Sequence, residues 1–150
     1  MDQTSNVERD VAKLDDFLCF AIYSANHALN RVYKPLLDAV GLTYTQYIAM
    51  VTLWERDDQT VGSLGEKLFL ESSTLTPVLK RLEALGLIVR TRDKADERQV
   101  RVQLTTTGRA LQDKAKAIPA CILEASGLDM DELTRLKTEI ATLRSSLLRE

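Results

Sequence analysis

The sequence predicts a mainly α-helical protein of the α+β type, in which a helix-turn-helix is followed by a two-stranded antiparallel wing. Three observations predict it. Apolar residues recur at helical spacing over most of the 150 residues. Two short β-like runs, 87–92 and 100–104, enclose a charged loop. The helical segment before them, 73–85, is apolar on one side and carries hydroxyl groups and two cations on the other.

The amino-terminal region predicts one long helix. Its apolar residues indicate a helix from about Asp15 towards Tyr33. Pro35 is expected to end or kink it, because the residue before a proline avoids the helical conformation. The helix presents one apolar stripe, formed by Leu14, Leu18, Ile22, Ala25, Leu29 and Val32.

A second helix is predicted to start within 42–46 and to continue to Trp54. It follows a short helical piece, 36–40, that stops at Gly41. The residues expected to face largely inward are Tyr47, Ile48, Val51 and Trp54.

Residues 60–68 predict a short helix with Thr60 as its N-cap, and residues 73–85 predict another, at helix-turn-helix spacing. Gly86 suits the left-handed position that often ends a helix. The polar face of the second helix supplies candidate DNA contacts: Ser72, Ser73, Thr74, Thr76, Pro77, Lys80 and Arg81. Any of the first three hydroxyl groups can also cap the start of this helix.

The two β-like runs predict a hairpin, or wing, whose loop at 93–98 is too polar for a core. The tip of such a wing commonly contacts the DNA backbone or the minor groove. Arg98 is the natural residue to enter a groove, and Asp96 is placed to orient its guanidinium. The other candidate DNA contacts of the wing are Arg90, Arg92 and Lys94.

After the wing, Thr105 or Thr106 is predicted to open a helix that reaches about Ala125 and bends at Pro119. Gly127 then breaks the chain.

The last helix is predicted to begin at a capping box made by Asp129 and Glu132. Its apolar residues follow the 3-4-3-4 spacing of a helix that packs on other helices: Leu133, Leu136, Ile140, Leu143 and Leu147. Burial within one chain is one explanation. We expect instead a dimer interface built from both terminal regions. A winged-helix dimer reads two half-sites about 34 Å apart, so double-stranded DNA with a pseudo-palindromic operator is the expected partner.

The charge of the chain is uneven. Its formal net charge of −2 argues weakly against nucleic-acid binding. Residues 72–101, however, contain seven Lys or Arg and four Asp or Glu, a net +3, while the remainder carries −5. The positive charge is therefore concentrated in the segment that is predicted to bind DNA.

The composition indicates no catalytic chemistry. One His and two distant Cys form no metal-ligand cluster, and no phosphate-binding loop or nucleophile elbow occurs. We therefore expect no metal, no cofactor and no enzyme. The longest apolar run, 17–23, is too short to span a membrane, and the amino end lacks a signal core. Two cysteines without an export signal predict a cytoplasmic protein.

Cys19 fits two roles. In the apolar run 17–21 it can be a small hydrophobic core residue. If Asp15 caps the helix, Cys19 instead lies in the first turns, where the helix dipole favours a thiolate. The nearby acidic residues oppose a thiolate, so a hydrogen-bond donor would be needed. The candidate donors are Tyr23, Tyr33 and Tyr44.

Helix geometry restricts how Tyr33 can reach Cys19. Fourteen residues separate the two, which is about 21 Å along a helix. They cannot meet on one straight helix. They can meet if the same helix of a second subunit runs antiparallel across a two-fold axis. The site would then be composite.

Three motifs, 82–88 (LEALGLI), 96–98 (DER) and 104–108 (LTTTG), resemble the winged-helix signature of the MarR family of transcription regulators. The resemblance covers nearly the whole chain. It implies a dimeric DNA-binding regulator, usually a repressor released by a small molecule or by oxidation. The expected organisation is one MarR-like domain over 1–150, with dimerisation helices in 1–40 and 106–150 and the winged helix-turn-helix in 41–105.

Three further segments, 18–24, 32–36 and 41–47, resemble the organic hydroperoxide resistance regulators within that family. The resemblance implies that Cys19 is the peroxide-sensing thiolate. It also implies tyrosines that hydrogen-bond the thiolate across the dimer, which fall on Tyr33 and on Tyr23 or Tyr44.

The same resemblance gives Cys121 a role. In some of these regulators a second cysteine, in the helix after the wing, forms an intersubunit disulfide with the oxidised first one, and Cys121 suits that type. Others are capped by a small external thiol.

The expected function is therefore a dimeric repressor that senses organic hydroperoxides through Cys19 and Cys121 and releases its operator. One alternative is a MarR-type repressor released by a non-covalent small ligand, with Cys19 merely packed. Another is a thiol peroxidase that turns over substrate at Cys19, which would leave the helix-turn-helix and wing unexplained.

Overall fold

Helices make up most of the computed structural model, which describes residues 13–149. The predicted fold class is confirmed: a mainly helical chain carries a small antiparallel sheet. In chain order the elements are a 3-10 turn (Leu14–Asp16), α1 (Leu18–Asp38), α2 (Tyr44–Glu55), β1 (Gln59–Thr60), α3 (Val61–Leu68), α4 (Ser72–Ala84), β2 (Ile88–Arg92), β3 (Val100–Leu104), α5 (Thr106–Ala115), α6 (Ile118–Ser126) and α7 (Met130–Leu147).

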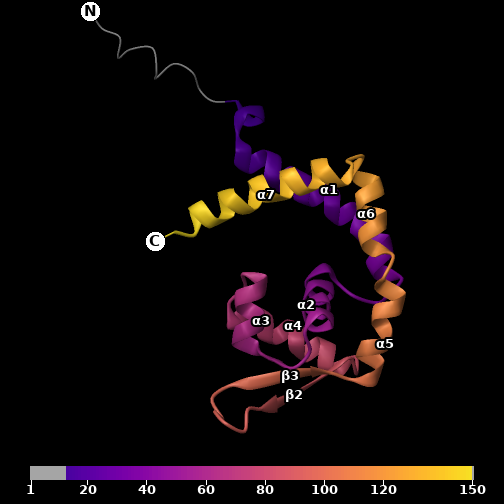
Figure 1. Ribbon diagram of the computed structural model, residues 1–150, viewed down its shortest axis with the longest axis vertical. Coiled ribbons are helices and arrows are strands. Elements are labelled where there is room, and N and C mark those ends of the chain that lie inside the picture. Colours follow the sequence, from indigo (N-terminus) through magenta and orange to yellow (C-terminus); the bar gives the residue numbers. More distant parts are fainter. Residues whose placement is uncertain (1–12, 150) are drawn as a thin grey trace, which may run out of the picture.

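The elements gather at two ends of the molecule (Figure 1). Helices α2, α3 and α4 lie over the β2–β3 hairpin at one end, and α1 and α7 lie at the other. Helix α5 runs from the hairpin towards α6, which packs against α1. Helices α1 and α7 therefore lie away from the wing. The two groups of elements are connected by α5 and by the turn between α1 and α2.

The core lies under the helix-turn-helix. Met50, Leu53, Leu64, Leu79 and Val102 are fully buried there.

The prediction that four residues of α2 face largely inward is confirmed: Tyr47 is buried, and Ile48, Val51 and Trp54 are half-buried and pack against the core. Helix α2 contacts α1, α3, α4 and α5, so more than one of its faces is covered. An apolar stripe on a single face therefore underestimates how much of the helix is buried.

The first helix starts three residues after the predicted Asp15, and it does not end at Pro35. Asp15 lies in the preceding 3-10 turn, and the N-cap position of α1 is Phe17, which makes no side-chain cap. At the other end, Pro35 lies inside the helix, which continues to Asp38. A proline there removes one backbone donor. The buried side chain of Leu37 anchors this last turn, and Gly41 ends the segment at φ 72°, as predicted.

The single helix predicted over 105–125 is in fact two helices. Thr105 caps α5 by accepting a hydrogen bond from the Gly108 amide, and α5 ends at Ala115. Pro119 does not bend a continuous helix, because it lies in the first turn of α6, where a missing N–H breaks no helical hydrogen bond. Ala115 and Ile118 are buried on either side of the break. Burial of both ends in the core stabilises the break.

The helix-turn-helix has the predicted bounds, with one correction. Thr60 caps α3, since its hydroxyl accepts a 3.1 Å hydrogen bond from the Ser63 amide, and Gly86 has φ 76° after α4. The serine and threonine hydroxyls at the start of α4 do not cap it. Glu71 occupies the N-cap position and makes no side-chain cap.

The sheet has one more strand than the sequence predicts. Its order is β1-β3-β2, with antiparallel neighbours, and β1 aligns Gln59 with Val102 and Thr60 with Arg101. A strand of two residues is too short to show an alternating pattern, so it depends on its partner strand.

In the last helix, Asp129 caps α7 by accepting a 2.8 Å hydrogen bond from the Glu132 amide. This is one half of the predicted capping box; the described hydrogen bonds do not include the reciprocal one from the Asp129 amide to the Glu132 side chain. None of the helices described is long and apolar enough to cross a membrane.

Candidate nucleic-acid interface and thiol site

Helix α4 is buried on one face and open on the other. Leu75, Leu79 and Leu82 are fully buried against the core. The side chains predicted to contact DNA lie on the open face: Ser72, Ser73, Thr74, Pro77, Lys80 and Arg81 are exposed, and Thr76 is half-buried. The Thr76 hydroxyl donates a 2.7 Å hydrogen bond to the Ser72 carbonyl. This face presents short polar groups and then two cations, a surface suited to base edges and phosphates.

A groove of about 390 Å³ separates α4 from the wing. Its walls come from the start of α3, from Ser72 and Thr76 on α4, and from Arg90 and Arg98 on the wing. Candidate residues from both the helix and the hairpin therefore border one groove.

At the wing tip, Arg98 and Asp96 form the predicted pair. Arg98 Nε lies 3.0 Å from Asp96 Oδ1, and Nη2 lies 3.3 Å from Oδ2. The hydrogen bond from Arg98 holds the pKa of the Asp96 carboxyl below its usual range. The Arg98 side chain is 90% exposed. A planar cation held in one orientation but left in solvent is suited to a narrow, negatively charged groove.

The other wing cations are placed differently. Arg90 turns towards α4: its amide lies 3.0 Å from Glu83 Oε2, and its Nη2 lies 3.1 Å from Glu83 Oε1. Arg92 donates to the Glu97 carbonyl at 2.9 Å, within the hairpin. Lys94 is exposed on the loop. Of these three, Lys94 is the one most available to a DNA phosphate.

Cys19 is exposed in the first turn of α1. Its neighbours on that turn, Leu18 and Ile22, are also exposed, as is Tyr23. The thiol is therefore not sealed in a core within the single chain, and among residues 13–149 no hydrogen bond reaches it. It lies on a surface that combines an accessible sulfur with apolar side chains.

Two of the three candidate tyrosines meet at the far end of α1. The rings of Tyr33 and Tyr44 are 5.0 Å apart, and Tyr47 lies 6.2 Å from Tyr33. Tyr23 is apart from this cluster and packs edge-on against His27 at 4.5 Å. Sequence reasoning assigned Tyr47 only to the core, although its i,i+3 spacing from Tyr44 already places both on one side of α2.

Burial, together with Tyr44 and Tyr47, raises the pKa of Tyr33 to about 12. Its hydroxyl therefore stays protonated at neutral pH and remains a hydrogen-bond donor. Between the ordinary pKa of about 10 and the raised value, the unfolded chain loses this proton while the folded chain keeps it, so stability falls as pH rises through that window. We expect wild type and Tyr33→Phe to differ, when both are titrated and followed by phenolate absorbance, by one group that ionises near pH 12. A difference centred near pH 10 would contradict the buried position of the Tyr33 hydroxyl.

Cys121 is half-buried on α6, the helix that packs against α1. Ile122, the next residue, packs against the core.

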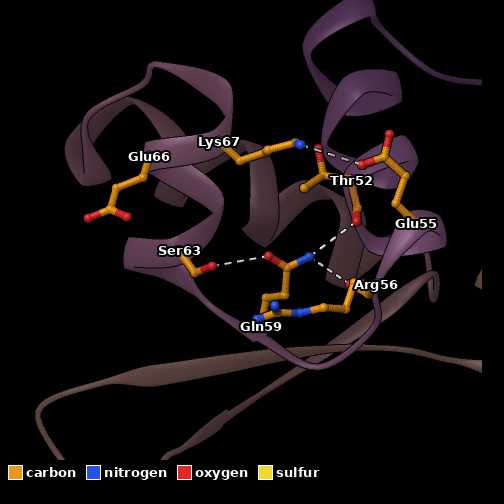
Figure 2. A pocket seen from close by; sticks show the side chains of 7 residues that line it. All are labelled: Thr52, Glu55, Arg56, Gln59, Ser63, Glu66 and Lys67. Atoms are coloured by element: carbon orange, nitrogen blue, oxygen red, sulfur yellow. Dashed lines mark hydrogen bonds and ion pairs between the residues drawn. The ribbon is translucent and has the colours of Figure 1, made fainter.

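A polar hollow of about 410 Å³ lies between the end of α2 and α3 (Figure 2). Gln59 crosses it: its amide donates to the Thr52 and Arg56 carbonyls at 3.1 and 2.6 Å and accepts from Ser63 at 3.1 Å. Glu55 and Lys67 face each other at 3.9 Å on its rim. The buried glutamine fixes the α2–β1 loop to the helix-turn-helix.

An exposed polar face on the second helix of a helix-turn-helix, bordered by a hairpin with an oriented arginine at its tip, defines a winged-helix DNA-binding regulator. Comparisons with known proteins agree. Residues 31–115 match the family model described as transcriptional regulator SarA/Rot. The chain belongs to the SarA/Rot- and MarR-type winged-helix transcription regulators.

Within this family the chain is related to the organic hydroperoxide resistance transcriptional regulator of Bacillus subtilis (strain 168). The two are 45% identical over 138 residues, which cover 92% of this chain and 94% of the relative. The HTH-type transcriptional regulator TtmR of Methylorubrum extorquens (strain PA1) is also 45% identical over 138 residues, covering 92% of this chain and 71% of the relative. Both relatives are regulators of transcription.

Among solved structures, AbfR of Staphylococcus epidermidis is similar in several states. Reduced AbfR bound to DNA is 36% identical with a TM-score of 0.76, over 91% of this chain and 95% of that chain. Overoxidized AbfR bound to DNA has a TM-score of 0.73, over 89% of this chain and 94% of that chain. Disulfide-formed AbfR has a TM-score of 0.60, over 95% of each chain. The TM-score is therefore lower for the disulfide form of AbfR than for the two DNA-bound forms and for the further AbfR crystal structure, which has a TM-score of 0.76.

Proposed function

We propose that this protein is a homodimeric transcriptional repressor that releases its operator when an organic hydroperoxide oxidises Cys19. The observation that carries the proposal is the exposed thiol in the first turn of α1, on an apolar helix face. Two relatives support it: the Bacillus subtilis relative is an organic hydroperoxide resistance regulator, and AbfR was solved in reduced and disulfide forms.

Exposed apolar side chains support the homodimer. Leu18, Ile22 and Leu29 on α1 and Leu136 and Ile140 on α7 are all exposed in the single chain. A chain in water rarely leaves a contiguous apolar surface of this kind open, because covering it is favourable. A second copy covers it symmetrically if α1 and α7 meet their counterparts about a two-fold axis.

The continuity of α1 supports a composite thiol site. Cys19 and Tyr33 lie on one unbroken helix, so about 21 Å separates them within a chain. An antiparallel α1 pair brings Tyr33 of the partner subunit to Cys19. A protonated phenol there donates a hydrogen bond to the thiolate and stabilises its charge.

The chemistry proceeds in two balanced steps. The Cys19 thiolate attacks one peroxide oxygen, the O–O bond breaks, and the alkoxide takes a proton, giving a sulfenic acid and an alcohol. The thiol of Cys121 of the partner subunit then attacks the sulfenic sulfur, which forms a disulfide and releases water. Cellular thiols reduce the disulfide and restore the first state.

Disulfide formation changes the arrangement of the two subunits and so causes release of the DNA. The two Cα atoms of a disulfide must come within about 7 Å, which pulls α1 of one subunit towards α6 of the other. A rotation of the dimer moves both wings out of register with their half-sites. In AbfR the overoxidized protein was solved bound to DNA, while the disulfide form differs more from this chain. These two observations favour the cross-link, not oxidation of the sulfur alone, as the releasing step.

A second candidate function is release by a non-covalent ligand. It is favoured by a cavity of about 860 Å³ between α7, Leu29 and Tyr44, which is large enough for a small molecule. This cavity opens on the same α1–α7 surface that the proposed dimer covers.

A gel-shift titration with cumene hydroperoxide tests the proposal, run beside intact mass measurement and non-reducing electrophoresis. We expect DNA binding to be lost in step with a cross-linked dimer that has lost two hydrogens per disulfide. Release with an external thiol adduct would transfer the resolving role from Cys121 to that thiol. Oxidation of Cys19 without release would refute the proposal, and many peroxide equivalents consumed per chain would favour a peroxidase.

A further inference from the structure

Two adjacent aspartates in the α2–β1 loop contact the base of the wing. Asp57 Oδ1 accepts 2.8 Å hydrogen bonds from the amides of Leu104 and Asp58. Asp57 Oδ2 pairs with Arg109 in the first turn of α5. Leu104 is the last residue of β3, so one carboxylate holds the wing strand, its own loop and α5 together.

Asp58 continues this network towards the wing tip. Its Oδ1 accepts from Arg101 Nε at 2.8 Å, and its carbonyl accepts from Arg101 Nη2 at 3.0 Å. Arg101 Nη1 then donates to Asp93 Oδ2 at 2.9 Å. Asp93 in turn accepts from the amides of Ala95 and Asp96 at 2.7 and 3.2 Å. The contacts therefore run from the α2–β1 loop, through β3, to the loop that carries Arg98.

Two carboxylates of this network are more buried than those of ordinary surface ion pairs. The side chains of Asp57 and Asp93 are 22% and 12% exposed, and each accepts more than one N–H donor, whereas Asp58 is 45% exposed. The hydrogen bond from Arg101 holds the pKa of the Asp93 carboxyl below its usual range, which keeps that carboxyl ionised. On its other side, the loop is fixed by Gln59 (Figure 2), so the aspartates are attached to a rigid support.

The charge of these residues makes them unexpected near DNA. An aspartate beside a phosphate backbone opposes binding, and simple electrostatics favours its absence. A geometric role accounts for their presence, because they fix the hairpin at one angle to α4.

We propose that Asp57 and Asp58 are positioning residues for DNA binding. Asp58 acts through Arg101 and Asp93, and Asp57 acts through the end of β3 at Leu104 and through Arg109. Together they hold the wing at the angle to α4 that lets Arg98 reach the groove. The inference rests on DNA contact by the wing, which is part of the proposed function.

The test compares Asp58→Asn and Asp57→Asn with the wild-type protein on a duplex that the reduced wild-type protein selects from a random pool. Both substitutions keep the shape of the side chain and remove a negative charge. If only electrostatics mattered, both variants would bind the duplex more tightly than wild type. If the aspartates position the wing, both variants should bind it about tenfold more weakly. Glu55→Gln is the matched control, because Glu55 is a nearby exposed acid that contacts Lys67 and not the wing. We expect this control to bind as well as wild type or slightly better.

The dependence on salt separates lost positioning from lost stability. Arg98→Ala should lower the slope of log affinity against log salt by about one for each wing. When Arg98→Ala is added to Asp58→Asn, the slope should change little, since the wing of Asp58→Asn no longer brings Arg98 to the DNA. A merely destabilised variant would keep the wild-type slope. Binding by Asp58→Asn that is as tight as wild type, with a full effect of Arg98→Ala, would overturn the inference.

A measurement without DNA keeps the inference testable if the proposed function fails. Hydrogen exchange of the hairpin amides within 93–99 should speed up about tenfold in Asp58→Asn but not in Glu55→Gln. Unchanged exchange in the hairpin would overturn the inference even if the wild-type protein selected no duplex.

Discussion

Cys19→Ser is expected to bind DNA as the reduced wild-type protein does and to lose all response to organic hydroperoxide. Serine has nearly the same size as cysteine, and the thiol is exposed, so within residues 13–149 the substitution leaves no cavity and breaks no hydrogen bond. Oxidised wild-type protein should fall towards non-specific affinity, a loss of about 10³-fold or more. The variant should lose none, because a hydroxyl group cannot form a sulfenic acid or a disulfide.

Cys121→Ser is the matched control for this experiment. It should still be oxidised at Cys19, which intact mass detects as one added oxygen, but it should form no cross-linked dimer on a non-reducing gel. Because the disulfide is proposed to be the releasing step, this variant should keep most of its DNA under peroxide when external thiols are absent. Full release of Cys19→Ser by peroxide would remove Cys19 from the mechanism.

Gly108→Ala is expected to produce the largest loss of stability among the substitutions discussed. Gly108 is buried in the first turn of α5, and a Cβ there would overlap the carbonyl oxygen of Leu87 and lie 3.0 Å from its carbon. Both obstacles are backbone atoms, so no flexible side chain can move aside. We expect the free energy of unfolding to fall by about 3 kcal/mol or more, as measured by urea denaturation.

Gly62→Ala supplies the control for this prediction. Gly62 is exposed in α3, and the nearest atom to its added Cβ is the Thr60 hydroxyl oxygen at 3.9 Å. Alanine is favoured over glycine in a helix, so this variant should be about 0.5 to 1 kcal/mol more stable. An unchanged urea midpoint for Gly108→Ala would show that the α5–Leu87 contact is looser than described.

The DNA-reading part of the fold was predictable because its signals are local. Thr60 caps a helix three residues before the amide that it binds, and Gly86 ends α4 directly after its last apolar residue. The Asp96–Arg98 pair joins residues two apart in the sequence. Each of these features needs only a few neighbouring residues to form, so the sequence pattern was sufficient.

The parts that the sequence missed depend on distant contacts. Strand β1 exists because it pairs with β3, and the break between α5 and α6 is stabilised by burial on both sides. The contacts of Asp57 and Asp58 with β3 and α5 join residues 43 to 52 positions apart. No local spacing rule indicates such pairs, so in the sequence the two aspartates look like part of a solvated loop.

Trp54 is the single tryptophan of the chain, and its indole N–H donates a 2.9 Å hydrogen bond to the carbonyl of Gly108 at the start of α5. The protein therefore carries one intrinsic fluorophore at the contact between α2 and the helix that leads to α6. Any rotation of α5 against α2 changes this hydrogen bond and the polarity around the ring, and with them the emission spectrum. Rapid mixing with oxidant can thus follow the motion in unlabelled protein, and the delay between sulfur oxidation and the optical signal measures how fast the change reaches α5.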